Sequence, residues 1–287
     1  MNYADVFFTS ADGIRLYARD YAGPANDSPA ILCLHGLTRN SKDFDNLARH
    51  LAPKARVLVP DTRGRGRSAR ASDLSTYRPE HYVADVLALL DLLDLPAVHL
   101  IGTSMGGLMS MMLLGRAPAR VRSVIINDIG PQVEPAGLQR IAGYVGQGNI
   151  EAGAHDWRAA AENVRRTNAD AFPDFGERDW EDMTRNLHVQ IDDRVVLDYD
   201  PAIARGLADG TAAPDLWKLF EGLAPRPMLV LRGELSDLLS EATVARMRAH
   251  SPLVETRVVA KRGHAPTLDE ADSRAAIDAF LAAQLAA

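Results

Sequence analysis

The chain has 287 residues, of which 47% are hydrophobic and 24% are charged, and its formal net charge is −6. This length and composition indicate one large globular domain, and the acidic balance excludes a general attraction to nucleic acid or anionic lipid. No stretch reaches the roughly 18 to 20 uninterrupted apolar residues of a membrane span, and the opening MNYADVFFTSADG lacks the pattern of a secretory signal. We therefore expect a cytoplasmic protein with no nucleic-acid or membrane partner.

The predicted strands recur along most of the chain. Two alternating segments, at about residues 4–9 and 14–21, predict an antiparallel hairpin that turns at Asp12-Gly13. Short apolar runs follow, and they begin at residues 30, 55, 97, 121, 226 and 254. Turns and segments of helical periodicity separate them, which predicts an α/β domain whose mostly parallel sheet, of about eight strands, has helices on both faces.

Two helices have clear sequence signals. Residues 79–93 carry one apolar stripe that opens at Pro79, as at the first turn of a helix. Near the carboxyl end, Thr267 and Glu270 form a capping-box pattern, so we expect the final helix to begin near Leu268.

The segment 131–224 differs from the rest, because nearly a hundred residues pass without a strongly strand-like run. Its charged helical pieces predict a helical lid inserted after the sixth strand, which leaves 1–130 and 225–287 as the core. Four aromatic side chains of this insertion are candidates for lining a pocket, although each is also typical of a lid core: Trp157, Trp180, Tyr199 and Trp217.

A possible nucleophile lies directly after the apolar run that begins at 97. Gly102-Thr103-Ser104-Met105-Gly106 fits the pattern Gly-x-Ser-x-Gly, in which a strained turn between strand and helix exposes the serine. The pattern alone is weak, but the preceding strand VHLIG and the following run LMSMMLLGRA supply the structural context that it requires. We therefore predict Ser104 as a nucleophile.

A serine nucleophile needs a base and a carboxylate that orients the base, and both are expected at later strand ends. His264 follows the run TRVVA and is the predicted base, and Asp237 in the loop ELSD is the predicted carboxylate. Asp128, which ends VIIND, is an alternative carboxylate, since it lies at another strand terminus. Glu234 is a weaker rival because it is too close to its strand.

Acyl transfer also requires amide donors for the oxyanion. The backbone amide of Met105 is one predicted donor, and Leu37, in the tight turn His35-Gly36-Leu37, supplies the second. We expect His35 to stabilise this turn rather than to take part in chemistry. The single cysteine, Cys33, is expected in the core, and no histidine or cysteine pair has structural-zinc spacing, so no metal is expected.

With these residues assembled, the chain resembles the α/β-hydrolase superfamily over its whole length. HGLTRN resembles the oxyanion loop of that family, GTSMGG its nucleophile elbow, and DTRGRGRS at 61–68 its Asp-x-Arg-Gly-x-Gly-x-Ser segment. The resemblance implies a cofactor-free serine hydrolase with a pocket between core and lid, and a mostly structural role for Asp61 and Arg63. The basic run Arg63, Arg65, Arg67 and Arg70 is interpreted as solvated loop charge.

The resemblance leaves several activities open. A serine at position 104 excludes relatives that use an aspartate there, such as haloalkane dehalogenases. We expect hydrolysis of a carboxylic ester, thioester or lactone of a small molecule, with carbon-carbon bond hydrolysis of a dienoic or diketone acid as the alternative. A ligand receptor with slow turnover is a third possibility, and the sequence does not predict the oligomeric state.

Overall fold

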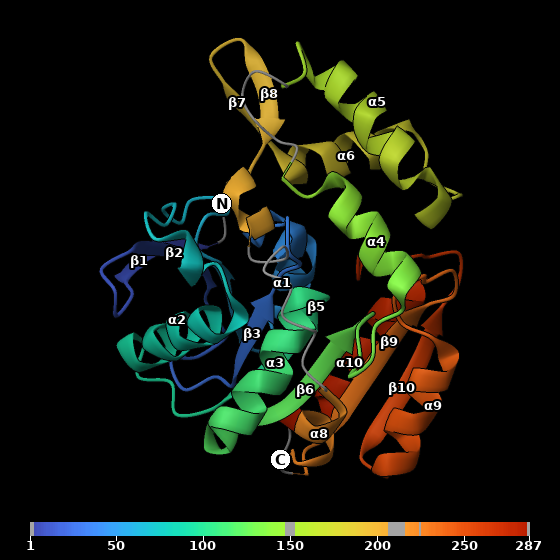
Figure 1. Cartoon of the computed structure of the whole chain (residues 1–287). Coiled ribbons are helices and arrows are strands. Elements are labelled where there is room, and N and C mark those ends of the chain that lie inside the picture. Colours follow the sequence, from blue (N-terminus) through green and yellow to red (C-terminus); the bar gives the residue numbers. More distant parts are fainter. Residues whose placement is uncertain (1–2, 147–152, 206–215, 224, 286–287) are drawn as a thin grey trace.

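The computed structural model describes residues 3–146, 153–205, 216–223 and 225–285 (Figure 1). The central sheet has eight strands in the described part of the chain. They are β1 (Ala4–Thr9), β2 (Arg15–Tyr21), β3 (Ala30–Leu34), β4 (Arg56–Asp61), β5 (Val98–Thr103), β6 (Val121–Asn127), β9 (Met228–Gly233) and β10 (Val254–Val259). The prediction of an α/β fold with about eight strands is confirmed.

The strands follow the order β1-β2-β4-β3-β5-β6-β9-β10, and only the pairs β1–β2 and β2–β4 are antiparallel. The predicted hairpin is present, and Gly13 in its turn has a φ of 85°, which favours glycine. The remaining pairs are parallel, namely β4–β3, β3–β5, β5–β6, β6–β9 and β9–β10. Because parallel strands end at one edge, the loops after β3, β5, β6, β9 and β10 share that edge.

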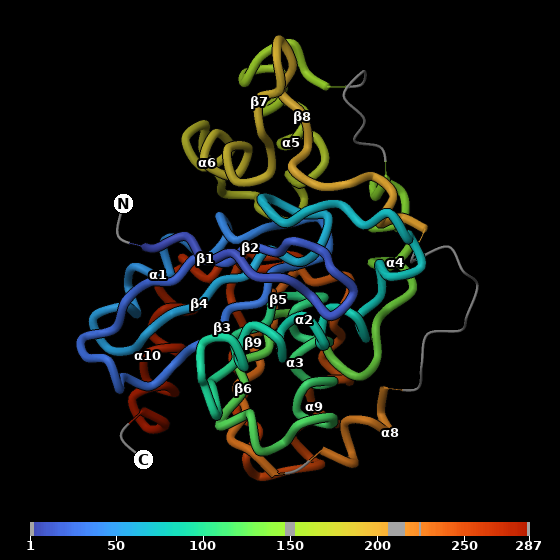
Figure 2. The backbone as a smooth tube through the Cα atoms, turned by 90° about the vertical axis from the view of Figure 1, so that its left-hand side faces the viewer, coloured from blue at the N-terminus to red at the C-terminus, as the bar shows by residue number. Residues whose placement is uncertain are grey.

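Helices cover both faces of the sheet, as side-chain alternation along the strands requires. In β3, Ile31 and Cys33 pack on the face covered by α1 (Asp45–Leu51) and α10 (Ala271–Leu285). Leu32 and Leu34 pack on the opposite face, against α2 (Pro79–Leu92) and α3 (Met105–Arg116). Figure 2 shows α1 and α10 on one side of the sheet and α2 and α3 on the other.

Two helix predictions have different outcomes. Helix α2 begins at Pro79, as its apolar stripe predicts. Helix α10 begins at Ala271, later than the expected start near Leu268. Glu270 does accept hydrogen bonds from Thr267, at its amide and its hydroxyl, but it also accepts from the amide of Leu268, whose φ of 70° keeps this segment out of the helix. None of the helices in the described ranges is long and apolar enough to cross a membrane.

The insertion between β6 and β9 forms most of the structure above the carboxyl edge of the sheet (Figure 1). It contains α4 (Pro135–Tyr144), α5 (Trp157–Asn168), α6 (Glu177–Leu187) and an antiparallel hairpin of β7 (His188–Ile191) and β8 (Arg194–Leu197). Sequence reasoning missed this hairpin because each strand has only four residues.

The end of the insertion returns to the core. Helix α8 (Leu216–Glu221) packs beside α3, where Leu219 lies near Gly115, and its buried side chains join the main core. The chain then enters β9, and α9 (Glu241–His250), which follows it, packs against β10 (Figure 1). The predicted lid of 131–224 thus includes a helix that packs on the core, and residues 147–152, 206–215 and 224 of that range lie outside the described residues.

Candidate active site

Ser104 follows β5 in a backbone conformation with φ 53° and ψ −116°, which residues other than glycine rarely adopt. Glycines on both sides make this turn possible. A Cβ atom at Gly102 would overlap the carbonyl of Gly106, and one at Gly106 would overlap the carbonyl of Leu34. The amide of Ser104 donates to Asn127 O at 3.0 Å, so β6 holds the turn in place. The sequence therefore places the serine on a tight elbow at the carboxyl edge of the sheet.

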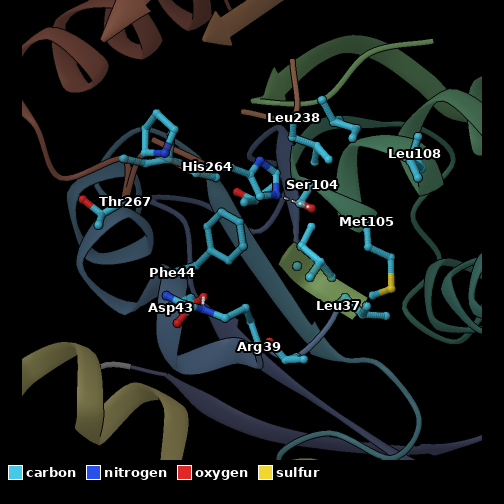
Figure 3. A pocket seen from close by; sticks show the side chains of 18 of the residues that line it. Leu37, Arg39, Asp43, Phe44, Ser104, Met105, Leu108, Leu238, His264 and Thr267 are labelled. Atoms are coloured by element: carbon cyan, nitrogen blue, oxygen red, sulfur yellow. Dashed lines mark hydrogen bonds and ion pairs between the residues drawn. The ribbon is translucent and has the colours of Figure 1, made fainter. Parts of the chain in front are cut away.

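His264 approaches this elbow from the loop that follows β10. Its Nε2 lies 2.8 Å from Ser104 Oγ, and Figure 3 shows the two side chains joined at the centre of the site. The imidazole is only 7% exposed. The fold thus brings together two residues separated by most of the chain, and these are the two that sequence reasoning paired.

The carboxylate that contacts His264 is Asp128, and the prediction of Asp237 for this position is wrong. Asp128 Oδ2 lies 2.9 Å from His264 Nδ1 and accepts a hydrogen bond from Ser236 Oγ at 2.6 Å. Its Oδ1 accepts from the Gly233 amide at 2.8 Å, and the residue is fully buried. Since the carboxylate only accepts, Nδ1 carries a proton and Nε2 is left as the acceptor that faces the serine.

Asp237 lies in the loop after β9 but faces the lid. Its carboxylate accepts two hydrogen bonds from Arg140 of α4, at 2.6 and 2.8 Å, and this contact holds the pKa of Asp237 below its usual value. The other rival, Glu234, accepts from the amide of Lys261 at 2.8 Å. The sequence signal for Asp128 is its position directly after a buried strand. Distinguishing it from Asp237 requires knowledge of the hydrogen-bond donors that β9 and the following loop direct at its carboxylate.

One predicted oxyanion donor belongs to the elbow itself, and the other belongs to the loop after β3. Met105 is the first residue of α3, so its amide has no acceptor inside the helix. Leu37 lies in the loop after β3, and neither amide donates to a protein acceptor in the described ranges. Figure 3 places both residues close to Ser104. These amides have the chemistry that a developing oxyanion needs.

His35 supports the loop that carries Leu37. The Thr62 amide donates to His35 Nε2 at 3.0 Å, so Nδ1 carries the proton and donates to Gly36 O at 2.7 Å. Burial lowers the pKa of His35 to about 3, which keeps the ring neutral near pH 7. This arrangement agrees with a structural role, as the sequence led us to expect.

The basic run at 63–70 is not uniformly solvated, which corrects the interpretation from sequence. Arg63 is buried and forms ion pairs with Asp85 at 2.6 Å and Asp12 at 2.7 Å. Arg65 is completely buried as well. Asp61 accepts hydrogen bonds from the amides of Ser41 and Arg67, and burial raises its pKa to about 6, so the segment supports neighbouring loops.

A cavity of about 1110 Å³ opens beside Ser104 and His264, between the sheet edge and the insertion. The lid lines it with aromatic and sulfur-containing side chains, namely Tyr144, Phe172, Phe175 and Met183. The four candidates for lining the pocket, Trp157, Trp180, Tyr199 and Trp217, are not among its lining residues, which corrects that possibility.

Each of the four candidates is used elsewhere. Trp157 donates to a lid glutamine at 3.2 Å, and Trp180 is buried in the small hydrophobic core of the lid. Tyr199 and Trp217 are buried in the core of the main domain. These large aromatic side chains thus pack against other residues instead of lining the cavity. The sequence pattern does not distinguish the two roles.

The fold and the site together define a class of protein. The family model described as "alpha/beta hydrolase fold" matches residues 29–271. The chain belongs to the α/β-hydrolase family, and it is an enzyme of the hydrolase class.

Three similar proteins show which members of the family the chain resembles. An α/β hydrolase from Novosphingobium aromaticivorans is 44% identical, with a TM-score of 0.92 and 98% of each chain covered. The 3-hydroxybutyrate-oligomer hydrolase of Cupriavidus necator is 35% identical over 88% of each chain. The 2-(acetamidomethylene)succinate hydrolase of Mesorhizobium japonicum is 27% identical over 79% of each chain.

Proposed function

We propose that the protein is a serine hydrolase that cleaves a carboxylic ester of a small molecule through an acyl-enzyme on Ser104. The observation that carries this proposal is the continuous hydrogen-bonded chain Ser104–His264–Asp128, with links of 2.8 and 2.9 Å. A serine hydroxyl attacks a carbonyl only when a base removes its proton, and the base requires a carboxylate that fixes its tautomer. The cavity beside the serine gives a substrate access to it.

The mechanism follows from the donors and acceptors. His264 Nε2 removes the proton from Ser104 Oγ while Oγ forms a bond to the acyl carbon, and Asp128 stabilises the imidazolium that results. The amides of Leu37 and Met105 hold the oxyanion. The imidazolium returns its proton to the departing alkoxide as the carbon-oxygen bond breaks, and water, deprotonated by His264, then releases the acid from the serine.

The relative that is named a 3-hydroxybutyrate-oligomer hydrolase supports a short ester of a hydroxy acid as the first substrate to test. Thioesters and lactones have the same acyl chemistry and belong in the same proposal. We further propose a small-molecule substrate, a cytoplasmic location and no cofactor. Hydrolysis of a carbon-carbon bond, which relies on the same three side chains, stays the alternative.

The test combines active-site labelling with a substrate panel. A fluorophosphonate should label the protein once, on Ser104, and Ser104→Ala should abolish both labelling and turnover. The panel contains 3-hydroxybutyrate dimer and trimer, p-nitrophenyl esters, a lactone and a dienoic diketone acid. Turnover of the diketone acid alone would replace the ester proposal by its alternative. A folded protein that resists the label would refute the proposal in favour of a binding scaffold.

A further inference from the structure

Arg39 lies in the same loop as Leu37 and lines the cavity. A Cβ atom built on Gly36 would lie 3.3 Å from Arg39 Cγ and 3.8 Å from Ser104 Cβ, so Gly36 alone separates the stem of this arginine from the nucleophile. Figure 3 shows the side chain running from this point along the cavity wall below Phe44. Arg39 and Ser104 therefore line the same cavity, with the stem of the arginine close to the elbow.

Among the described residues, the guanidinium of Arg39 is held at one nitrogen. Its Nε donates to Asp43 Oδ2 at 2.5 Å, and its side chain is 26% exposed. The two terminal amino groups have no partner among the residues that the structure describes. Since a guanidinium has five N–H donors, four stay available, in the planar fork that binds a carboxylate with two parallel hydrogen bonds.

The other arginines that line the cavity are committed elsewhere or lie away from the serine. Arg262 donates to Glu270 at 3.0 Å and to Asp174 at 2.5 Å. Arg78 takes part in another interaction, and Arg116 lies at the opposite end of α3 from Ser104. Arg39 is thus the cation beside the serine whose donors are available.

The charge of Arg39 also reaches the lid across the cavity. Burial raises the pKa of the Tyr144 phenol, while the positive charges of Arg140 and Arg39 oppose this shift. Tyr144 ends α4 and lines the cavity, so a ligand held by Arg39 lies between the core loop and the lid helix. Apolar walls such as Phe44 strengthen a charge-assisted hydrogen bond there by excluding water.

We propose that the terminal amino groups of Arg39 bind a carboxylate of the substrate, and that the enzyme therefore selects acidic esters. This inference rests on the proposed serine chemistry. The substrate class is an ester whose free carboxylate is a few bonds from the scissile carbonyl, as in a hydroxy-acid oligomer with an unesterified end. Asp43 holds the guanidinium at Nε and leaves its terminal amino groups for the acid.

The experiment compares 3-hydroxybutyrate dimer with its methyl ester, which lacks the charge. In Arg39→Gln, the ratio of kcat/KM for the acid over that for the methyl ester should fall roughly 10- to 100-fold, mainly through KM. Arg39→Lys should recover part of this ratio, because it keeps the charge without the fork. Arg116→Gln, which removes another cavity-lining cation, should leave the ratio as in the wild type.

Two results would overturn the proposal: an unchanged ratio in Arg39→Gln, or equal losses for both substrates, which would indicate that Arg39 only shapes the loop. Thermal unfolding shows whether each variant is folded. Failure of the serine mechanism has a different signature, namely a wild-type protein that fluorophosphonate does not label.

A separate observation concerns Arg65, whose buried guanidinium pairs with no carboxylate in the described ranges. Its Nε donates to Leu37 O at 2.9 Å, and one Nη donates to Tyr82 Oη at 3.1 Å and to Arg63 O at 2.7 Å. The other Nη lies 4.0 Å from Met105 Sδ. Burying a charge without a counter-ion costs free energy of folding, so packing alone does not account for an arginine at this position.

The contacts of Arg65 lead to both predicted oxyanion donors, through the carbonyl of Leu37 and the sulfur of Met105. We infer that Arg65 is a positioning residue, which fixes the backbone of Leu37 so that its amide faces the carbonyl oxygen of the substrate. Its charge favours the anionic intermediate, because the guanidinium is buried and pairs with no carboxylate among the described residues. This inference also rests on the proposed serine chemistry.

Arg65→Lys and Arg65→Met test this role. Both should lower kcat per labelled active site at least 10-fold with little change in KM, and both should weaken binding of a boronic acid, which forms a tetrahedral anion on the serine, in parallel. Arg63→Lys is the control, since it disturbs a buried ion pair and should lower stability without changing the ratio of boronate to substrate affinity. An unchanged kcat per labelled site in either folded Arg65 variant would refute the inference.

Discussion

The assignment of Asp128 rather than Asp237 is tested by replacing each with asparagine. All three groups around the Asp128 carboxylate are donors, namely His264 Nδ1, Ser236 Oγ and the Gly233 amide. An asparagine that keeps its oxygen toward the Gly233 amide presents its NH2 to His264. The imidazole then accepts at Nδ1 and carries its proton on Nε2, where it can no longer take the proton of the serine.

The magnitude follows from this change of tautomer. Turnover should fall about 10⁴-fold, which corresponds to roughly 5 kcal/mol of lost transition-state stabilisation. Asp237→Asn removes a 34%-exposed ion pair with Arg140, so its effect on kcat should stay within about tenfold. The two variants thus differ by about three orders of magnitude in kcat.

The assay measures kcat/KM of each variant on a short p-nitrophenyl ester. The concentration of active sites used in this calculation comes from fluorophosphonate titration of a wild-type sample with the same folded fraction. The double variant Asp128→Asn/Asp237→Asn shows whether Asp237 replaces Asp128 as the partner of His264. If it does, the activity that Asp128→Asn retains disappears in the double variant. A loss of 10³-fold or more in Asp237→Asn, with Asp128→Asn nearly as active as the wild type, would refute the assignment.

Three further predictions concern the elbow, pH and the lid. Gly106→Ala should lower the melting temperature and the titratable sites because its Cβ overlaps a backbone carbonyl, whereas Gly143→Ala, with open space around the new methyl, should not. His35, with its pKa lowered to about 3, binds a proton more readily when unfolded. Unfolding free energy should therefore fall by about 2 kcal/mol from this residue alone between pH 8 and 5, and His35→Asn should flatten that slope in urea titrations. Arg140→Gln should lower stability by about 1 kcal/mol or less, and increase proteolysis within α4, because its contact with Asp237 ties the lid to the core.

Strands and the elbow were predictable because their signals are local. The alternation of β3 and the glycines around Ser104 are constraints that neighbouring residues impose on one another. The contact of His264 with Ser104 was also predictable, because the parallel topology brings the loops after β5 and β10 to one edge. These predictions required the order of elements and no detail of loop conformation.

The carboxylate was not predictable in the same way, because two acidic residues follow neighbouring strands. Asp128 has a φ of 56°, which turns its side chain toward the loop after β9, where it meets Gly233 and Ser236. Asp237 pairs instead with Arg140, whose position depends on how α4 packs. The choice is therefore made by tertiary contacts between the core and an insertion whose packing the sequence pattern does not determine.

Two of the corrections, those to Asp237 and to the pocket-lining aromatic residues, have a common physical origin in the insertion. Arg140 binds the carboxylate of Asp237, and packing buries Trp180 in the lid core and Tyr199 in the main core, so other side chains, such as Tyr144, line the cavity. The core supplies the serine, its base and its carboxylate, while the insertion decides which polar groups stay available beside them. Chemistry in this fold is consequently predictable from strand ends, whereas we infer that substrate selection depends on a few cavity side chains, Arg39 foremost, whose donors are not all used by neighbouring residues.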